Sequence, residues 1–316
     1  MSDVAGNNAA ALRELVLRGL ARNRIPGLHF PGNFLALERR RFDRDAVSIA
    51  LPRGAHIEDG NGRVGLSAVM LLVDVTLATA MRPFLAPGVR TATVSMQVNF
   101  TGVPAVGPLL CSARCLGFSH DAVLPQAICR GELTSGSEIV CYCSGSFVQL
   151  DTPANVTLAP TAWEVEPVSD PPPLNARSLD APERKILRHA DRCLSALPPG
   201  EAFVNRFWGG DVHAADGKGR SRLMLGPHVN NRVGNAQGGV MMAHAAVTAA
   251  HAVPRHRLIE SVAAWFISPG AGTELRLRSE TIQQGRSLAV VRTQVFAPGR
   301  KRVLEVISNH AVAKSA

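Results

Sequence analysis

Residues 231–253 read NRVGNAQGGVMMAHAAVTAAHAV, a polar turn with two consecutive glycines that leads into a long apolar helix. Pro254 follows directly, and proline cannot continue a helix because it lacks the backbone N–H. Four strand-like runs come next, at 258–268, 274–283, 287–296 and 302–312. Consecutive antiparallel strands after such a helix are expected to form a curved sheet around it, which explains why the helix is apolar nearly all round.

The first half of the chain repeats this order about 170 residues earlier, and such self-similarity indicates a duplication. A glycine-rich turn at 59–62 leads into an apolar helix at 65–84, and the strand-like runs lie at 91–101, 108–119, 122–133 and 138–150. Elements also precede each central helix: a helix at 7–22 and a strand at 42–51, then a helix at 182–197 and strands at 202–208 and 220–225.

We therefore predict an α+β fold built from two tandem modules. The first module occupies residues 1–150, a proline-rich linker follows at 151–182, and the second module occupies 183–316. Two curved sheets paired edge to edge would cover each other's open strands and share one core.

The composition limits the kinds of partner. The formal net charge is +9, but the arginines that supply most of it are scattered along the chain, and aromatic residues make up only 5%. Since a surface that stacks bases needs aromatic side chains, we expect no nucleic-acid partner. Arginine forks suit phosphate oxygens, so a small phosphorylated ligand fits the same charge.

The cysteines and the start of the chain indicate a cytoplasmic protein. None of the six cysteines forms a Cys-x-x-Cys pair, so we expect free thiols and no metal site. The first residues lack the pattern of a secretory leader. The apolar run at 64–81 carries Asp74, whose charge would cost several kcal/mol in a membrane, so this run is expected to be a buried helix and not a span.

The mouth of the second central helix has the groups needed for acyl chemistry. Gly238 and Gly239 lie where backbone N–H groups have no partner within the helix, and the helix dipole adds positive potential there. Such N–H groups can stabilise the oxyanion that forms when a thioester carbonyl is attacked. The amides of Asn231 and Gln237 could orient the ligand or a water. The alternative is that the glycines only permit tight packing.

This segment resembles the motif Asn-x-x-Gly-x-x-His-Gly-Gly of the PaaI-like hot-dog acyl-CoA thioesterases. Asn231, Gly234, Gly238 and Gly239 match, and Gln237 stands in place of the histidine. In that family an acidic residue follows the histidine by nine positions, but here that position holds an alanine, residue 246.

The strands behind the motif resemble the first module of TesB-type double hot-dog thioesterases. The shared features are a strand that ends in Phe266 with Pro269 and Gly270 behind it, and a later Gly-Arg-Ser turn at 285–287.

The first module has the opposite defect. When its central helix is aligned with that of the second module, Asp59 replaces the motif asparagine, Gly62 matches the motif glycine, and residues 65–67 replace His-Gly-Gly. Asp74 stands at the acidic position, and Thr93 lies on the next strand, where the family has a supporting Ser or Thr.

The resemblance implies that one complete site forms between the modules. Its catalytic residues would be Asp74 and Thr93 from the first module, with Asn231, Gln237 and Gly238 from the second. Gly234 and Gly239 would bind substrate. The other site, made by residues 59, 65 and 66 with Ala246, would be inactive.

The resemblance thus predicts a hydrolase for thioesters of coenzyme A or of an acyl carrier protein, without metal or other cofactor. Asp74 would act as general base or as nucleophile, and the alternative is a structural carboxylate that bonds neighbouring backbone. Two other functions stay open: a protein that binds acyl thioesters or lipids without catalysis, and an enoyl thioester hydratase. The hydratase ranks last because neither half has an Asp and a His five residues apart. Assembly into a homo-oligomer is also left open.

Overall fold

The computed structural model describes residues 2–119, 123–166 and 168–313, with side chains from residue 8 onward. The elements of the first half are α1 (Ser2–Asn23), α2 (Phe30–Phe34), β1 (Glu38–Phe42), β2 (Val47–Leu51), α3 (Leu66–Ala80), η1 (Arg82–Phe84), β3 (Arg90–Phe100), β4 (Leu109–Phe118), β5 (Gln126–Ser135) and β6 (Glu138–Leu150). Those of the second half are η2 (Ala176–Ser178), α4 (Ala181–Ser195), α5 (Phe203–Phe207), β7 (Val212–Ala215), β8 (Lys218–Met224), α6 (Gly238–His251), β9 (Arg257–Phe266), β10 (Glu274–Gln284), β11 (Leu288–Phe296), η3 (Pro298–Arg300) and β12 (Arg302–Val312).

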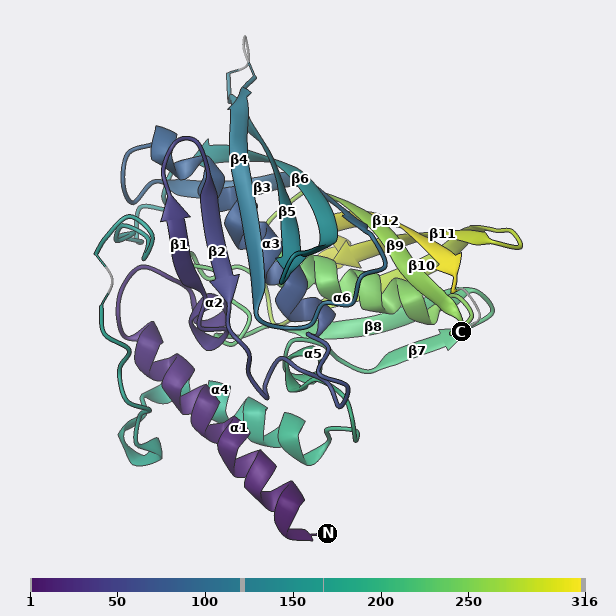
Figure 1. Cartoon of the computed structure of the whole chain (residues 1–316), viewed down its shortest axis with the longest axis horizontal. Coiled ribbons are helices and arrows are strands. Elements are labelled where there is room, and N and C mark those ends of the chain that lie inside the picture. The colour runs from purple at the N-terminus through teal and green to yellow at the C-terminus, as the bar shows by residue number, and fades with distance from the viewer. Residues whose placement is uncertain (1, 120–122, 167, 314–316) are drawn as a thin grey trace.

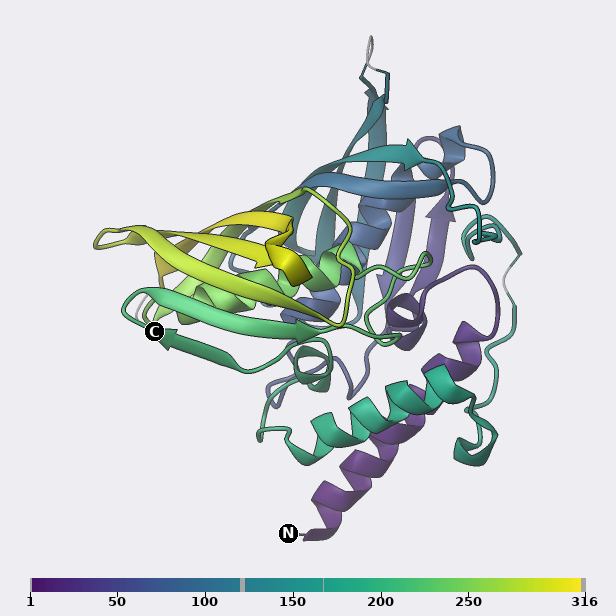
Figure 2. The same ribbon diagram turned by 180° about the vertical axis from the view of Figure 1, so that it is seen from behind.

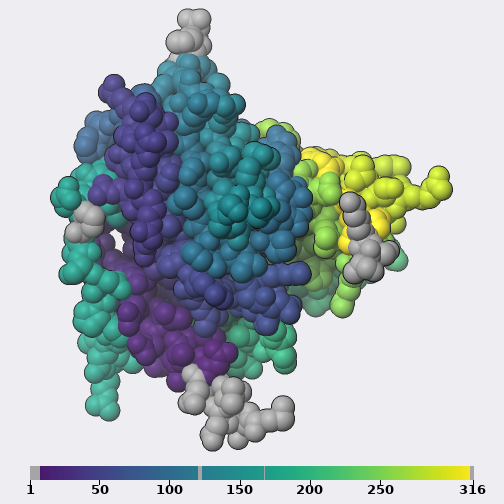
Figure 3. All heavy atoms as spheres, viewed as in Figure 1, coloured from purple at the N-terminus to yellow at the C-terminus, as the bar shows by residue number. Residues whose placement is uncertain are grey.

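The described strands form one continuous sheet in the order β1-β2-β4-β5-β6-β3-β9-β12-β11-β10-β8-β7. The first six strands of this order come from the first half and the last six from the second, and each half curves around its own central helix (Figure 1). The predicted α+β fold of two curved antiparallel sheets, each wrapped around a helix, is therefore confirmed. In Figure 3 the purple-to-blue first half forms most of the visible face, and the green-to-yellow second half projects from its edge.

The two halves join where β3 pairs with β9. This pairing is antiparallel and runs from Ser95 opposite Trp265 to Asn99 opposite Ser261. Each of these strands has its own half on its other side, so neither leaves an open edge at the junction. The junction also brings α3 and α6 into contact, which places the two helices that matter for the site side by side.

The central helix α3 is buried nearly all round, as its composition predicts. Of its 15 residues, 13 are buried, Asp74 among them. Within the described chain, one helical stretch, Leu66–Phe84, is long and apolar enough to cross a membrane, and 83% of its apolar window is buried inside the fold. This stretch is thus the core helix of the first module.

Two of the elements predicted ahead of the central helices are wrong, and α2 and β7 were not predicted. The run at 42–51 is not one strand, because the Asp43 side chain accepts hydrogen bonds from the amides of Asp45 (2.9 Å) and Ala46 (3.0 Å) and so turns the chain between β1 and β2. The run at 202–208 is the helix α5 and not a strand. Its valine and aromatic residues favour strands in general, but here the helical conformation lets both Phe203 and Phe207 pack against Phe34.

These elements extend the duplication beyond the helix and four strands seen in the sequence. The order of a long helix, a short helix, a hairpin, a central helix and four strands runs from α1 to β6 and again from α4 to β12. The leading helices α1 and α4 pack against each other on the side of the molecule away from β12 (Figure 2).

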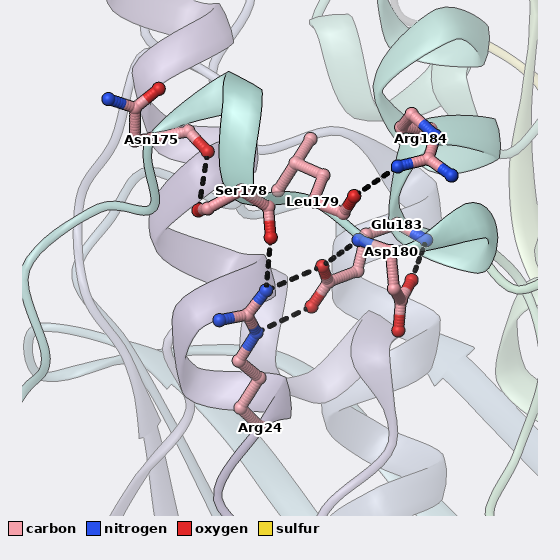
Figure 4. A network of polar contacts seen from close by, with 7 residues as sticks. All are labelled: Arg24, Asn175, Ser178, Leu179, Asp180, Glu183 and Arg184. Carbon is pink, nitrogen blue, oxygen red and sulfur yellow. Dashed lines mark hydrogen bonds and ion pairs between the residues drawn. The ribbon is translucent and has the colours of Figure 1, made fainter.

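An ion-pair network ties the linker and α4 to the end of α1 (Figure 4). The Arg24 guanidinium donates to both carboxylate oxygens of Glu183 at 2.8 Å and to the Ser178 carbonyl at 3.1 Å. Glu183 and Asp180 also form a reciprocal capping box at the start of α4, with both bonds at 2.8 Å. The linker is therefore held to the first module.

Candidate active site

The turn before α6 is built by Asn231. Its side-chain oxygen accepts hydrogen bonds from the amides of Val233 (3.0 Å) and Asn235 (3.1 Å). Gly234 has a φ of +80°, a backbone conformation that glycine adopts without strain. The asparagine and glycine of the motif thus shape the turn that leads to the helix mouth.

Gln237 caps α6 and reaches across the module boundary. Its side-chain oxygen accepts from the Val240 amide at 2.9 Å, which satisfies one of the free N–H groups of the first turn. Its Nε2 donates to Oδ2 of Asp74 at 2.6 Å. Both side chains are buried, at 5% and 4% exposure. The amide of glutamine can do both jobs because it carries an acceptor and a donor on one side chain.

Asp74 receives two further hydrogen bonds. The Gly239 amide donates to Oδ2 at 3.0 Å, and the hydroxyl of Thr93 donates to Oδ1 at 3.0 Å. Burial raises the pKa of Asp74, and the bonds from Thr93, Gln237 and Gly239 offset part of that rise. The sequence-predicted pairing of Asp74 and Thr93 with the second helix mouth is thus present in the structure.

Close packing of the two central helices makes the bond from Gly239 to Asp74 possible. A Cβ on Gly239 would lie 2.7 Å from the Met70 carbonyl oxygen and 2.8 Å from the Leu71 Cα. These distances are shorter than real contacts allow, so only glycine lets α6 approach the backbone of α3 this closely.

The Gly238 amide remains for a ligand. No described residue accepts a hydrogen bond from this N–H, which lies at the positive end of the α6 dipole. Gly238 lines a cavity of about 340 Å³ together with Asp74, Thr93, Asn231 and Gln237. The arrangement offers a carboxylate and a free N–H donor at the surface of one cavity.

Gly234 and Gly239 do not line this cavity, so they are not placed to contact substrate directly. Gly234 lies in the turn, and the amide of Gly239 already donates a hydrogen bond to Asp74. Their contribution is to position other groups. The sequence alone could not separate Gly238 from Gly239, because only the packing of α3 shows which N–H is already used.

The equivalent mouth at the start of α3 is covered. Oδ1 of Asn205, on α5, accepts from the Ser67 amide at 3.3 Å and would lie 2.7 Å from a Cβ on Gly65. The position equivalent to Asp74 is Ala246, whose methyl group is fully buried in the core. The second of the two sites related by pseudo-symmetry therefore has neither an accessible helix mouth nor a carboxylate.

The sequence reasoning did not find the other polar residues of the cavity. Its further charged or titratable lining residues are Arg82 on η1, Arg90 at the start of β3, Arg232 in the turn before α6, and His29 at the start of α2. Part of the linker closes one side through Leu158, Thr161 and Trp163. Arg82 could have been noticed, because Asp74, Val75, Ala78 and Arg82 fall on one helical stripe; the linker residues gave no such signal.

In the described part of the chain, no group of three or more His, Cys, Asp or Glu side chains is placed to hold a metal ion.

Known proteins resemble this chain in its fold and in the sequence of its second module. Residues 227–311 match the family model described as the acyl-CoA thioesterase N-terminal domain. None of the curated proteins matches the chain in sequence.

Several solved structures span nearly the whole chain. A candidate thioesterase from Novosphingobium aromaticivorans has a TM-score of 0.54 at 15% identity, over 92% of this chain and 100% of its own. A candidate oleoyl thioesterase from Lactobacillus plantarum also has a TM-score of 0.54, at 9% identity, over 86% of this chain and 98% of its own. A hot-dog protein of unknown function from Alicyclobacillus acidocaldarius has a TM-score of 0.52 at 11% identity, over 87% and 96% of the two chains.

By fold, the chain is a hot-dog protein, and more narrowly a double hot-dog protein with both modules in one polypeptide. Its second module is similar to the N-terminal domain of acyl-CoA thioesterases, so the resemblance drawn from the sequence motifs is confirmed.

Proposed function

We propose that the protein hydrolyses acyl thioesters of coenzyme A or of an acyl carrier protein at the single site between its modules. The observation that carries this proposal is the position of Asp74. A buried carboxylate from the first module lies at hydrogen-bond distance from the mouth of α6 in the second, and both groups face the same cavity.

The proposed mechanism assigns a role to each group. The thioester carbonyl oxygen accepts a hydrogen bond from the Gly238 amide, which stabilises the negative charge that develops on that oxygen. Oδ2 of Asp74 already accepts two hydrogen bonds and Oδ1 only one, so Oδ1 is the oxygen that takes the proton from the attacking water. The tetrahedral intermediate then expels the thiolate, which receives that proton, and leaves a carboxylic acid and a free thiol.

The raised pKa of Asp74 supports the base role. A carboxylate in water is a weak base, and burial increases its affinity for a proton. Thr93 and Gln237 fix the orientation of the carboxylate, since each bonds one of its two oxygens.

A specific observation favours a second function, the binding of acyl thioesters without catalysis. The three donors that bond Asp74 also reduce its basicity, and they would suit a carboxylate that only locks the two modules together.

Release of free thiol separates the two functions. We expect the protein to release thiol from acyl-CoAs of several chain lengths, followed with a thiol reagent, and Asp74→Asn to lose this activity. Binding of the same acyl-CoAs by calorimetry without thiol release from any of them would refute hydrolysis and leave the binding function.

The proposed location is the cytoplasm. All six cysteines are free, which agrees with a reducing compartment.

A further inference from the structure

The cavity extends along α3 away from Asp74. Val75, Ala78 and Thr79 line it on the same side of α3 as Asp74, and Arg82 lines it from η1, which follows directly. Arg82 lies eight positions after Asp74, which corresponds to roughly 12 Å along the helix axis. A substrate whose carbonyl lies at Gly238 can therefore extend its acyl chain along this apolar stripe towards Arg82.

The far end of the stripe carries a buried ion pair. Arg82 is 8% exposed and donates to the Val89 carbonyl at 3.2 Å and to the Thr91 hydroxyl at 3.3 Å. Its guanidinium also lies 3.6 Å from Oε1 of Glu164, which belongs to the linker. The other oxygen of Glu164 accepts from the amide and the hydroxyl of Thr161, at 2.5 and 2.9 Å. Glu164 is thus already occupied by neutral donors and by Arg82.

Arg232 adds a second positive charge without a second carboxylate. Its Nη2 donates to the Ala159 carbonyl, and its Nη1 is buried with no partner among the described residues. Burial lowers the pKa of Arg232, and the charge of Arg82 lowers it further, whereas Glu164 raises it. Arg90 also lines the cavity and donates to the Asp151 backbone carbonyl, so three guanidinium groups against the one linker carboxylate leave this part of the cavity with an excess of positive charge.

His29 does not change this balance. It also lines the cavity, but burial and the charge of Arg232 lower its pKa to about 4, so it is neutral near pH 7. An unpaired, buried guanidinium N–H costs free energy unless a ligand atom accepts from it.

We propose that Arg232, with Arg82 beside it, binds a carboxylate at the far end of the substrate's acyl group. This inference rests on the proposed function and names its substrate class: thioesters of dicarboxylic acids, with the second carboxylate free. Along roughly 12 Å of helix, an extended chain of roughly six to ten carbons fits between the two ends. The arginines select an anionic oxygen group, and a phosphate of coenzyme A is a second group of that kind.

The burial of Arg82 and of the Nη1 atom of Arg232 favours the carboxylate. Arg82 is 8% exposed and packed against the linker, whereas the nucleotide of coenzyme A is large and strongly hydrated. A compact carboxylate at the end of an apolar chain can reach the two guanidinium groups without opening this wall.

The test compares octanoyl thioesters with octanedioyl thioesters that carry a free terminal carboxylate, each made on coenzyme A and on N-acetylcysteamine. N-acetylcysteamine has no phosphate, so a preference seen with it belongs to the acyl chain. Because a hydrogen bond to a charged group contributes about 1.5–3 kcal/mol, we expect the octanedioyl chain to have roughly a tenfold or greater advantage in kcat/KM on both carriers.

Arg232→Met is expected to abolish this ratio, and Arg114→Met, on an exposed arginine of β4 away from the cavity, is expected to keep it. Equal melting temperatures of both variants and the wild type would show that the variants fold. Equal use of both chains by the wild type overturns the inference, even if hydrolysis itself is observed. A preference on coenzyme A alone, with weaker binding of free coenzyme A by Arg232→Met, would assign the arginines to phosphate and also overturn it.

Affinity separates a failure of this inference from a failure of the proposed function. The non-hydrolysable thioether analogues of the two N-acetylcysteamine thioesters can be titrated by calorimetry whether or not the protein is a hydrolase. Tighter binding of the carboxylated analogue supports the inference in either case, and equal binding refutes it.

Discussion

Asp74 owes its environment to residues that are distant in sequence. Its neighbours on α3 are apolar and give its carboxylate no partner, but Gln237, 163 residues away, donates to it at 2.6 Å. Thr93 and Gly239 complete the set. A buried carboxylate that lacked these bonds would be strongly unfavourable, so the two modules must be packed together before Asp74 is tolerated in the core.

Replacing Asp74 with Asn tests this residue without removing its hydrogen bonds. The asparagine oxygen can accept from Gln237 and Gly239, while its NH₂ group can donate to the Thr93 hydroxyl. The variant lacks a group that can take a proton from water, so we expect kcat to fall by about 100-fold or more.

The stability of Asp74→Asn should not fall. Because the pKa of Asp74 is raised in the fold, the ionised carboxylate destabilises the protein at pH values above that pKa, and this cost disappears as the pH drops through it. The neutral amide never carries this cost, so the melting temperature at pH 7.5 should be unchanged or higher. A large drop in melting temperature with retained hydrolysis would show that Asp74 is a structural residue.

Gln237 and Asn205 provide a matched pair at the two helix mouths. Each side-chain oxygen accepts a backbone N–H in the first turn of a central helix, from Val240 and from Ser67 respectively. Loss of such a cap typically costs about 1 kcal/mol, so both Gln237→Ala and Asn205→Ala should destabilise the protein in thermal melts. Gln237→Ala should destabilise it more, because it also removes a hydrogen bond from the buried Asp74 carboxylate.

Only Gln237→Ala should slow hydrolysis, because Gln237 alone also orients Asp74. We expect its kcat/KM to fall by about tenfold or more, since one hydrogen bond to a charged group is lost. Equal losses of activity in both variants would mean that the mouth of α3 is also part of a working site.

The packing of α3 against α6 depends on one close contact at the start of α6. Two adjacent glycines lie there and have different surroundings. A Cβ on Gly239 would meet the backbone of α3 at 2.7 Å, whereas a Cβ on Gly238 would meet side-chain atoms, Oδ2 of Asp74 at 3.0 Å and the Phe266 ring at 3.2 Å. Backbone cannot move aside as a side chain can, so the two glycines should respond differently to the same substitution.

We expect Gly239→Ala to push α3 and α6 apart and to cost about 1–3 kcal/mol of stability, as overpacked cores do. Thermal melts should show this as a drop of several degrees. Gly238→Ala should melt much closer to the wild type but hydrolyse thioesters poorly, because its methyl group would enter the cavity beside Asp74. The reverse order of stability would show that α6 contacts α3 differently.

In the part of the molecule that the structure describes, four buried histidines and the half-buried His29 have pKa values well below the ordinary value. Burial lowers the pKa of His29, His56, His244 and His310 to about 4, and that of His228 to about 3. In the unfolded chain each of them would titrate near its ordinary value of 6.5. Between these values the unfolded chain binds more protons than the folded protein, so the free energy of unfolding must fall as the pH drops.

We predict a loss of stability that begins near pH 6.5 and continues towards pH 4, with a slope of roughly 1 kcal/mol for each histidine and pH unit. Urea unfolding at pH 7.5, 6 and 5 measures it. His56 is the best residue for a control, because neither of its ring nitrogens has a partner among the described residues, and His56→Leu should make the pH dependence shallower. A free energy of unfolding that stays constant from pH 7.5 to 5 would contradict the prediction.

The sequence by itself determined the kinds of elements and their repetition. Apolar residues at helical spacing defined the central helices, alternation defined the strands after them, and the glycines at 238–239 marked the helix mouth, because such patterns depend only on neighbours along the chain. The family motif added Asp74 and Thr93 to that mouth. Propensity failed at α5, where aromatic residues that favour strands form a helix because Phe34 and Trp208 surround them in the core.

Only the tertiary structure decided which groups meet and which stay free. It assigned the Gly239 amide to Asp74 and left the Gly238 amide to the cavity. It covered the mouth of α3 with Asn205, and it placed Arg232 beside Arg82 and the linker. These contacts join residues that lie far apart in the sequence. They exist only once β3 has paired with β9 and α3 has packed on α6. Local sequence patterns carry no information about which residues from distant parts of the chain come together in space.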